Sequence, residues 1–359
     1  MSWLLAFAGF ALLILLHEAG HFAAAKAVGM RVERFALFFP PLILRKQVGE
    51  TEYAIGALPL GGYVKISGMN PSEDLPDEVR TRAYWSQPVW KRIVVIAAGP
   101  AVNLVLAFVL LLVFYSAIGP RDITGTVGVI ERGYPAAGAL EPGDRLVAVD
   151  GRRAEPAELS RLIASHRCAG PPVDGCKATA PARVIVERDG RERSYTLTPI
   201  YDERTEKTRL GFGYAADGPR DPLALGEAVS VSGTQFWFIT KETVKLPARL
   251  FDAERRREIS GIVGSYEVTR QTIINDIAST IGLMAIISLS LAIINLFPFL
   301  PLDGGHIFWA VVEKIRRRPI SYGVMERAGL VGFMLVMGLF FLGLSNDIDT
   351  LMGEGFNVR

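Results

Sequence analysis

The residues most able to do chemistry are His17, Glu18 and His21, which belong to a His-Glu-Ala-Gly-His sequence. On a helix, residues four apart lie on the same face, so both imidazole rings can reach one metal ion. Two histidines at this spacing are typical of a zinc site, and the adjacent glutamate can take a proton from a water that zinc activates. The spacing therefore predicts a zinc site that activates water.

The motif follows directly on an apolar run from Trp3 to Leu16. At ~1.5 Å per residue, His17 lies roughly 21 Å along a helix from Trp3. The hydrocarbon core of a bilayer is about 30 Å thick, so the zinc site is predicted to lie inside the membrane. The N-terminus has neither a basic segment nor a convincing cleavage site, which favours a retained span over a signal peptide.

The composition is that of a membrane protein with a soluble part. Half of the 359 residues are hydrophobic, and the mean hydropathy is positive. The net charge is only +2, and no nucleic-acid partner is expected. The two cysteines, Cys168 and Cys176, are eight residues apart, which excludes a Cys-x-x-Cys motif. They are expected to form a loop disulfide if their segment is extracytoplasmic, and to be free thiols if it is cytoplasmic.

Four segments are predicted to cross the membrane, at about 3–28, 93–118, 277–300 and 328–344. The last is short and would need little tilt. Lysine and arginine gather between the first and second segments and between the third and fourth, which places both loops in the cytoplasm. Both termini and the long segment 119–276 are then extracytoplasmic, and the predicted location is the inner (plasma) membrane.

The region 31–92 is predicted to form β-hairpins rather than a plain loop. Short β-type runs are separated by a turn at residues 48–51, by Pro59 and by Gly61-Gly62. Non-helical backbone near a membrane is tolerated where it is buried in protein or lines a cavity. A re-entrant sheet beside the zinc site fits this rule, and an ordinary cytoplasmic hairpin is the alternative.

Residues 125–199 are predicted to form a compact β-rich domain. Its strands are expected at 127–130, within 143–151, at 183–188 and at 193–198, with a helix over 156–165. Asp189-Gly190 is a strong hairpin signal between the last two strands. The stretch 223–250 is too polar to span, and we expect an amphipathic helix at the outer interface or, alternatively, a helix packed on the β-rich domain.

A catalytic zinc usually has three protein ligands, so a third must come from outside the first span. Asp303 is the only carboxylate between Asp276 and Glu313 in the sequence, and it is expected at the cytoplasmic end of the third apolar segment. Its local sequence favours a helix cap at a Pro/Gly turn. The need for a third ligand at this depth makes it the predicted ligand.

Two further polar residues lie near Asp303 in the sequence. Asn295 is about two turns earlier in an otherwise apolar segment, where a buried amide needs a partner. It is predicted to bind the substrate backbone or a developing oxyanion, and a helix–helix hydrogen bond is the alternative. His306 could replace Asp303 as a ligand, but a supporting or capping role is favoured.

Together these residues resemble the bacterial site-2 protease family, the intramembrane zinc metalloproteases of the type that regulates sigma-E. The resemblance covers most of the chain. It rests on four motifs in order: the His-Glu-x-x-His sequence, Gly61-Gly62-Tyr63-Val64, Gly99-Pro100-Ala101-Val102-Asn103, and Asn295 followed by Leu302-Asp303-Gly304-Gly305. The chain departs from the family pattern in having room for one PDZ domain rather than two, and in Leu300 and Ile262 where prolines are usual.

The resemblance implies that zinc (Zn²⁺) is bound by His17, His21 and Asp303. It also implies that Glu18 is the catalytic base and that Asn295 assists at the substrate. The β-rich domain would be a PDZ domain, whose peptide groove would follow the strand Val127-Gly128-Val129-Ile130. On the hairpin, the residues expected to hold substrate by strand addition are Gly61, Gly62, Tyr63 and Val64.

The predicted fold is thus a polytopic α-helical membrane protein of four transmembrane helices, with a membrane-associated β-hairpin region and an inserted extracytoplasmic PDZ-like α+β domain. Its expected parts are the first transmembrane helix (1–30), the hairpin region (31–92), the second transmembrane helix (93–118), the PDZ-like domain (119–200), a linker with an interfacial helix (201–276), the third transmembrane helix with the Leu-Asp-Gly-Gly motif (277–306), and a cytoplasmic loop, fourth helix and tail (307–359).

The resemblance implies hydrolysis of peptide bonds in transmembrane segments of single-span membrane proteins, with an anti-sigma factor or remnant signal peptides as substrates. The lipid bilayer is the other expected partner, and the oligomeric state stays open. The alternatives are a catalytically silent membrane-anchored PDZ adaptor, a metal-ion transporter and a protease of the prenyl-protein type. The intact zinc motif, the clustering of polar residues at one depth and the Leu302-Asp303-Gly304 sequence argue against them.

Overall fold

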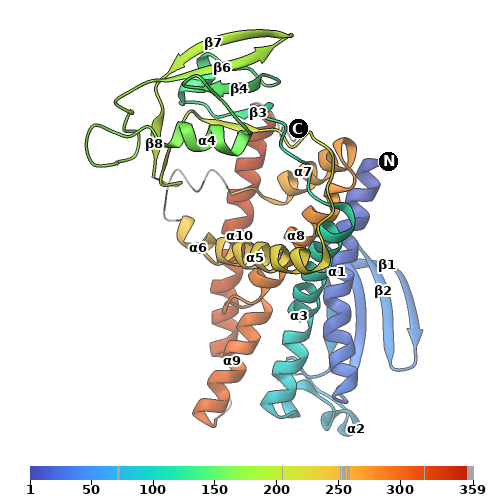
Figure 1. Cartoon of the computed structure of the whole chain (residues 1–359). Coiled ribbons are helices and arrows are strands. Elements are labelled where there is room, and N and C mark those ends of the chain that lie inside the picture. Colours follow the sequence, from blue (N-terminus) through green and yellow to red (C-terminus); the bar gives the residue numbers. More distant parts are fainter. Residues whose placement is uncertain are drawn as a thin grey trace. The chain divides into compact units, whose positions relative to one another are not determined.

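The structure is a computed structural model, and it describes residues 1–70, 73–203, 205–250, 252, 256, 259–318 and 320–353. Residues 354–359 of the predicted tail lie outside this set. The chain divides into two compact units, one formed by Met1–Ala117 with Ala224–Val358 and the other by Ile118–Leu223 (Figure 1). The first unit contains the zinc motif.

The first unit consists of helices and one hairpin. Its elements are α1 (Ser2–Ala27), β1 (Val32–Val48), β2 (Thr51–Ile66), α2 (Asp77–Arg80), η1 (Tyr84–Ser86), α3 (Val89–Val113) with the π-helical turn η2 (Phe114–Ile118), α5 (Leu225–Val244), α6 (Leu246–Arg249), α7 (Ile262–Asn275), α8 (Ser279–Asn295), α9 (Asp303–Arg316) and α10 (Tyr322–Met352).

Three helices in the described part of the chain are long and apolar enough to cross a membrane. They are Ser2–Ala27, Val89–Ile118 and Gly323–Met352, which correspond to the first, second and fourth predicted spans. The last was expected to be short, but α10 has 31 residues. The sequence prediction stopped where polar residues begin, whereas the helix continues through Glu326 and Arg327 at one end and Asn346 and Asp347 at the other.

The third predicted span is two helices, so the expectation of one continuous helix over 277–306 was wrong. The apolar helix α8 ends at Asn295, and α9 begins at Asp303. Pro298 and Pro301 lie in the connection, where each lacks an N–H donor and disfavours helical backbone at the preceding residue. With 17 residues, α8 is roughly 25 Å long, somewhat less than the hydrocarbon thickness.

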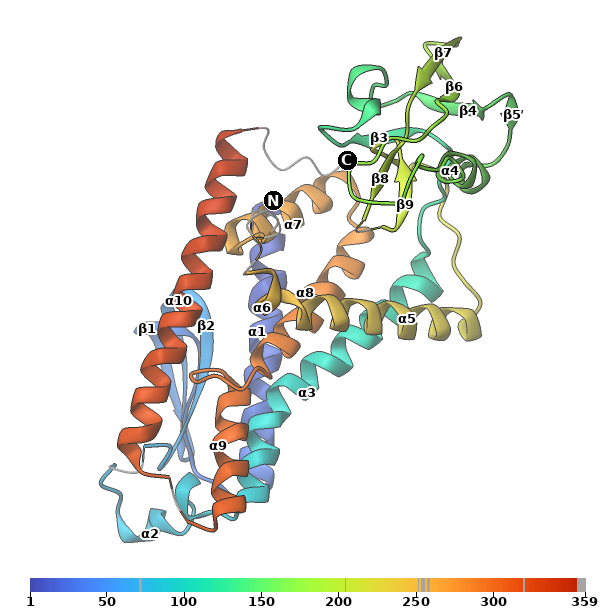
Figure 2. The same ribbon diagram turned by 90° about the vertical axis from the view of Figure 1, so that its left-hand side faces the viewer.

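The predicted hairpin region contains β1 and β2, joined by the expected turn at Gly49-Glu50. The pairing shifts register several times, so that residues 34–37 pair with both 52–55 and 62–65 of β2. Phe22 of α1 packs against the hairpin, and Figure 2 shows the two strands alongside this helix. The hairpin is therefore fixed to the helix that carries the zinc motif.

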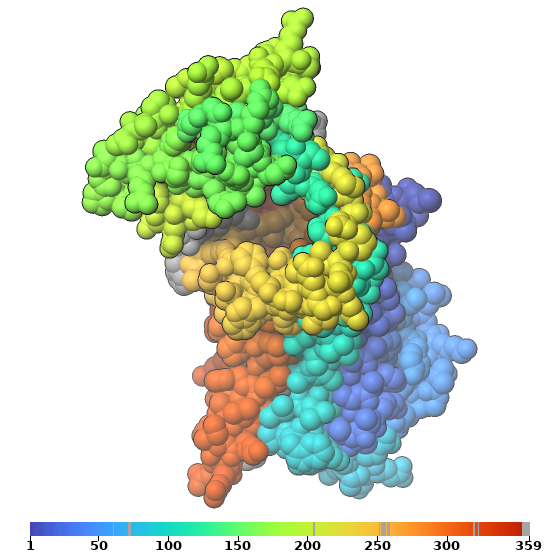
Figure 3. All heavy atoms as spheres, viewed as in Figure 1, coloured from blue at the N-terminus to red at the C-terminus, as the bar shows by residue number. Residues whose placement is uncertain are grey.

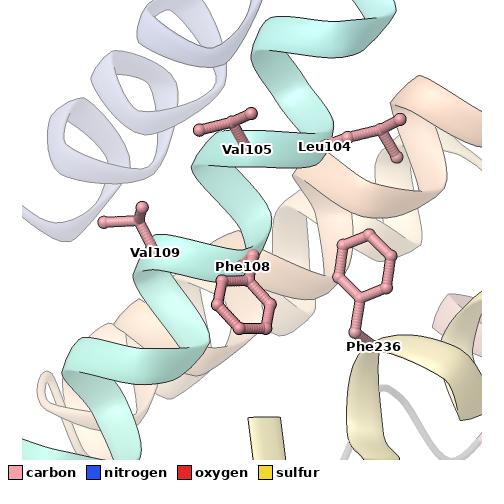
Figure 4. A pocket seen from close by; sticks show the side chains of 5 residues that line it. All are labelled: Leu104, Val105, Phe108, Val109 and Phe236. Atoms are coloured by element: carbon pink, nitrogen blue, oxygen red, sulfur yellow. The ribbon is translucent and has the colours of Figure 1, made fainter. Parts of the chain in front are cut away.

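The stretch 223–250 forms α5 and α6, and α5 packs on α3 and α8 within the first unit. Ala107, Ile239 and Leu289 form the buried contact, and Figure 3 shows α5 lying across α3. An apolar pocket opens beside this contact (Figure 4). It is lined by Leu104, Val105, Phe108 and Val109 of α3 and by Phe236 of α5.

The second unit is β-rich, as predicted. Its elements are β3 (Val127–Ile130), η3 (Pro135–Gly138), β4 (Arg145–Val149), β5 (Arg152–Arg153), α4 (Pro156–Ala164), β6 (Ala182–Arg188), β7 (Arg191–Leu197), β8 (Ile200–Asp202), β9 (Lys207–Arg209) and β10 (Phe212–Tyr214). The strand order β5-β4-β6-β7 forms a four-stranded antiparallel sheet, and α4 packs on β4.

This unit extends beyond the predicted boundary at residue 200. β10 pairs with β3, and Phe212 and Tyr214 pack against the buried core of the unit. Short strands of three residues give little signal in a sequence, which explains why this return was missed. Cys168 and Cys176 form a disulfide, which was one of the two expected outcomes.

Candidate metal centre

Three potential ligand atoms meet between α1 and the first residue of α9. The Nε2 atoms of His17 and His21 are 3.2 Å apart, and they lie 3.1 and 3.4 Å from Oδ2 of Asp303. Both histidines are buried, and the Asp303 side chain is 18% exposed. Among the described residues these three side chains form a cluster able to hold a metal ion, as the sequence predicted.

The separations fit zinc. In a tetrahedral site with bonds of about 2.0–2.1 Å, neighbouring ligand atoms are roughly 3.3 Å apart, which is the size of this triangle. Two imidazole nitrogens and one carboxylate oxygen are also a donor set that zinc accepts, with a fourth position left for water or substrate. The residues present therefore fit a catalytic zinc ion.

His21 is held in place by α3. Its Nδ1–H donates to the main-chain oxygen of Val95 at 2.9 Å, which leaves Nε2 for a metal. A Cβ atom at Gly99 would lie only 2.2 Å from His21 Nε2, so the ring occupies the space that a side chain at position 99 would need. Gly20 makes a similar approach to the main chain of Ala98. Gly20 of the His-Glu-Ala-Gly-His motif and Gly99 of the Gly-Pro-Ala-Val-Asn motif thus allow α1 and α3 to pack closely at the site.

Asp303 is positioned by the tight packing of the N-terminus of α9. A Cβ atom at Gly304 would lie 2.2 Å from the oxygen of Leu296, and one at Gly305 would lie 2.4 Å from the nitrogen of Leu300. Only glycine permits this approach, which explains the Gly-Gly pair after Asp303. The carboxylate thus comes from the N-terminal turn of α9, and not from the end of the apolar helix as expected.

A buried ion pair links α9 to α3 farther from the cluster. Arg92 donates two hydrogen bonds to Glu313, at 2.7 and 2.9 Å. The Arg92 side chain is 11% exposed, and its guanidinium lies over the ring of Tyr84. Arg92 precedes the predicted second span at 93–118 but lies inside α3 and is buried. The pair fixes the helix that carries Asp303 to the helix that orients His21.

Glu18 lies beside the ligands and against the hairpin. It precedes His21, a predicted ligand, by three residues on α1, and its side chain is in contact range of Gly62 of β2. Tyr63, the next residue, stacks on Phe39 and accepts a hydrogen bond from Arg34 at 3.2 Å. The glycine and tyrosine of the predicted substrate-binding segment are therefore next to the predicted base.

The hairpin turn is also tied to the end of α1. Glu50 accepts hydrogen bonds from Lys26 at 2.7 Å and from both terminal nitrogens of Arg82. The hydrogen bonds from Arg82 and Lys26 lower the pKa of Glu50 to about 2. This network holds the hairpin turn and Arg82 to the C-terminal end of the helix with the zinc motif.

The other predicted site residues are placed as follows. Asn295 is the half-buried C-terminal residue of α8, and His306 lies one turn after Asp303 on α9, outside the three-residue cluster of the described chain. Val127 of β3 is buried, whereas Val129 is 57% exposed. The remaining residues of the predicted groove, Gly128 and Ile130, are partly buried on the same strand.

A zinc-binding pair of histidines, a carboxylate ligand and an adjacent glutamate define the class of zinc metallopeptidase. The model of peptidase family M50 matches residues 5–339, and the chain belongs to this family. It is therefore a membrane-bound zinc metalloprotease of the site-2 protease type.

The relatives agree with this assignment. A Brucella suis protein, provisionally named a zinc metalloprotease, is 30% identical over 93% of this chain and 92% of its own length. A Nostoc protein with the same provisional name is 31% identical over 94% of this chain and 93% of its own. Metalloprotease MmpA of Caulobacter vibrioides is 28% identical over 94% of this chain and 92% of its own.

Proposed function

We propose that the chain hydrolyses peptide bonds in transmembrane segments of single-span membrane proteins, at a zinc ion held by His17, His21 and Asp303. The proposal is carried by the meeting of Asp303 with His17 and His21, two residues of a helix long enough to cross a membrane. A water-activating centre at that depth has membrane-embedded peptide bonds as its nearest substrates. The substrate classes that we favour are an anti-sigma factor and, second, remnant signal peptides.

The roles of the side chains follow from their places. A bound zinc ion supplies Lewis acidity and lowers the pKa of water to near 7. Glu18 takes the proton of the attacking water and returns it to the leaving amine. Asn295 donates from its amide to the substrate carbonyl oxygen as negative charge develops there. His17, His21 and Asp303 would hold the metal ion, each through one ligand atom.

A helical substrate must unwind before it is cut, because a helix hides its carbonyls in internal hydrogen bonds. The hairpin offers a means of holding it extended. Residues 62–65 of β2 pair with 34–37 of β1, and Gly62 lies against Glu18. We propose that a substrate strand adds beside Gly61, Gly62, Tyr63 and Val64 and so passes the base.

We propose that the second unit is a peptide-binding module of the PDZ type. In one role, the second unit binds a substrate C-terminus along β3, where Val129 is exposed. In the other, it limits the size of the substrates that reach the zinc site. The positive-inside rule supports an extracytoplasmic place for this unit and for both termini, with the zinc site towards the cytoplasmic side of the inner membrane. A disulfide between Cys168 and Cys176 agrees with an oxidising compartment.

The test is cleavage of a single-span substrate in membranes by the wild type and by Glu18→Gln. Cleavage is expected to fall by at least about a hundredfold, because the general base is removed. Glu78→Gln, at an exposed position of α2, is the matched control and should cleave like the wild type. Equal cleavage by the wild type and Glu18→Gln would overturn the proposed role of Glu18.

A further inference from the structure

Two of the buried polar groups that have no hydrogen-bond partner among the described residues lie on neighbouring helices, one on α1 and the other on α3. One is Nδ1 of His17, and the other is the side-chain amide of Asn103, whose oxygen and nitrogen are both unpaired. Asn103 is 0% exposed within an apolar helix. The hydroxyl of Ser288 donates to the main-chain oxygen of Asn103 at 3.0 Å, and so leaves the amide unused. A buried amide without a partner destabilises the folded protein, so its presence calls for a reason.

The packing of α1 on α3 brings these two groups to the same level. Lys91 near the start of α3 reaches the main-chain oxygen of Val28, just beyond the end of α1, and His21 lies against Gly99. The two helices therefore run in opposite directions, as Figure 1 also shows. His17 is one turn before His21 on α1, and Asn103 is one turn after Gly99 on α3. Because the helices are antiparallel, one turn back along α1 and one turn forward along α3 lead in the same spatial direction. His17 and Asn103 therefore lie at the same level of the helix pair.

The chemistry of the site requires an acceptor at this place. A histidine that binds metal through one ring nitrogen almost always donates the other N–H to a carbonyl, carboxylate or water. His21 does so to the oxygen of Val95. His17, whose Nε2 faces Asp303, needs the same support at Nδ1. The amide oxygen of Asn103 is a buried acceptor at the same level of the same helix interface.

We propose that Asn103 is a positioning residue of the zinc centre: one buried water accepts the Nδ1–H of His17 and donates to Oδ1 of Asn103, which fixes the tautomer that presents Nε2 to the metal. This inference rests on the proposed ligand role of His17. The competing role is a helix–helix hydrogen bond from the amide to α8, which would leave zinc affinity unchanged.

The experiment measures zinc affinity rather than proteolysis. Purified full-length protein carrying Glu18→Gln competes for zinc with a chelator, alone and with Asn103→Leu, Asn103→Asp, Ser288→Ala or His17→Ala added. Asn103→Leu, which has similar volume and no acceptor, is expected to weaken zinc binding about 10- to 100-fold. Asn103→Asp keeps an acceptor oxygen and should retain most of the affinity.

The controls separate the possible failures. Ser288→Ala removes the neighbouring hydrogen bond without touching the amide, and should bind zinc like the Glu18→Gln protein. Thermal unfolding of the zinc-free proteins shows whether Asn103→Leu still folds. Unchanged affinity in Asn103→Leu, or equal losses in the Leu and Asp variants, would overturn the role of Asn103. Undiminished affinity in His17→Ala would instead overturn the ligand set on which the inference rests.

Discussion

Gly62 of β2 touches Glu18 so closely that a Cβ atom at position 62 would lie 2.6 Å from Glu18 Cγ. The main chain of the hairpin therefore passes directly beside the proposed base. Glu18 and Gly62 are 44 positions apart in the chain (62 − 18), and the contact depends on the absence of a side chain at Gly62. It also connects the two proposed tasks of the site, which are to hold an extended substrate and to activate water next to it.

Gly62→Ala should impair catalysis while sparing the metal. The added methyl displaces the Glu18 carboxylate, and a loss of at least about tenfold in kcat/KM is expected, which corresponds to about 1.4 kcal/mol. Zinc content should stay at the wild-type level, because Gly62 does not touch the ligands' triangle. Gly213→Ala in β10, where a Cβ atom meets nothing within 4 Å, is the matched strand control.

Gly99→Ala, unlike Gly62→Ala, should lower the zinc content of the protein. The new Cβ atom would lie 2.2 Å from His21 Nε2, the atom proposed to bind metal. Alanine stabilises a helix interior by about 1 kcal/mol relative to glycine, so a loss of zinc could not be attributed to a weaker helix. Metal analysis of the purified protein measures the effect. Gly338→Ala in α10, with open space around the new methyl, should keep its zinc.

Asp303→Ala should also lower the zinc content, because two histidines alone leave the ion with one protein ligand too few. The loss is measured on protein purified without chelator and compared with Glu18→Gln, which removes the base and keeps the ligands. Wild-type zinc in Asp303→Ala would exclude Asp303 as a ligand. His306→Ala tests the alternative, and we expect it to retain zinc.

The Arg92–Glu313 pair should contribute to stability through both partners. Arg92→Met leaves Glu313 without its partner and is expected to destabilise the protein by about 2 kcal/mol, below the range for fully buried pairs because Glu313 is 26% exposed. Thermal unfolding in detergent measures this change. The double variant Arg92→Met, Glu313→Met removes the unpaired charge as well and should recover part of the loss. Additive losses would show that the two residues are not coupled.

Glu50 should make stability depend on pH in the acid range. Its pKa falls from an ordinary 4.5 to about 2 in the folded protein, through hydrogen bonds from Arg82 and Lys26. A lowered folded-state pKa stabilises the fold above about pH 4.5, and this contribution disappears as the pH falls towards 2. Thermal midpoints of the wild type and Glu50→Gln should therefore differ at pH 7 and converge near pH 2. A constant difference would contradict this role.

Sequence patterns predicted most of the regular structure for identifiable reasons. The apolar run before His17 and the apolar segment after Arg92 gave two spans, since long apolar helices need no tertiary information. The turn at Gly49-Glu50 and the longer strands of the second unit (β3, β4, β6 and β7) follow from local turn and strand signals. The break of the third segment was misjudged because Pro298 and Pro301 were treated as interruptions of one helix rather than as a connection between two.

The sequence by itself determined the chemistry of this protein. The spacing of His17 and His21, with Glu18 between them, defines a zinc-binding helix face, because four residues make about one turn wherever the helix lies. It also singled out Asp303 as the carboxylate to complete the site. Tertiary structure alone decided how these groups meet. Contacts at Gly62 and Gly99 bring together segments far apart in the chain, and no local sequence pattern shows which neighbour occupies the space that a glycine leaves free.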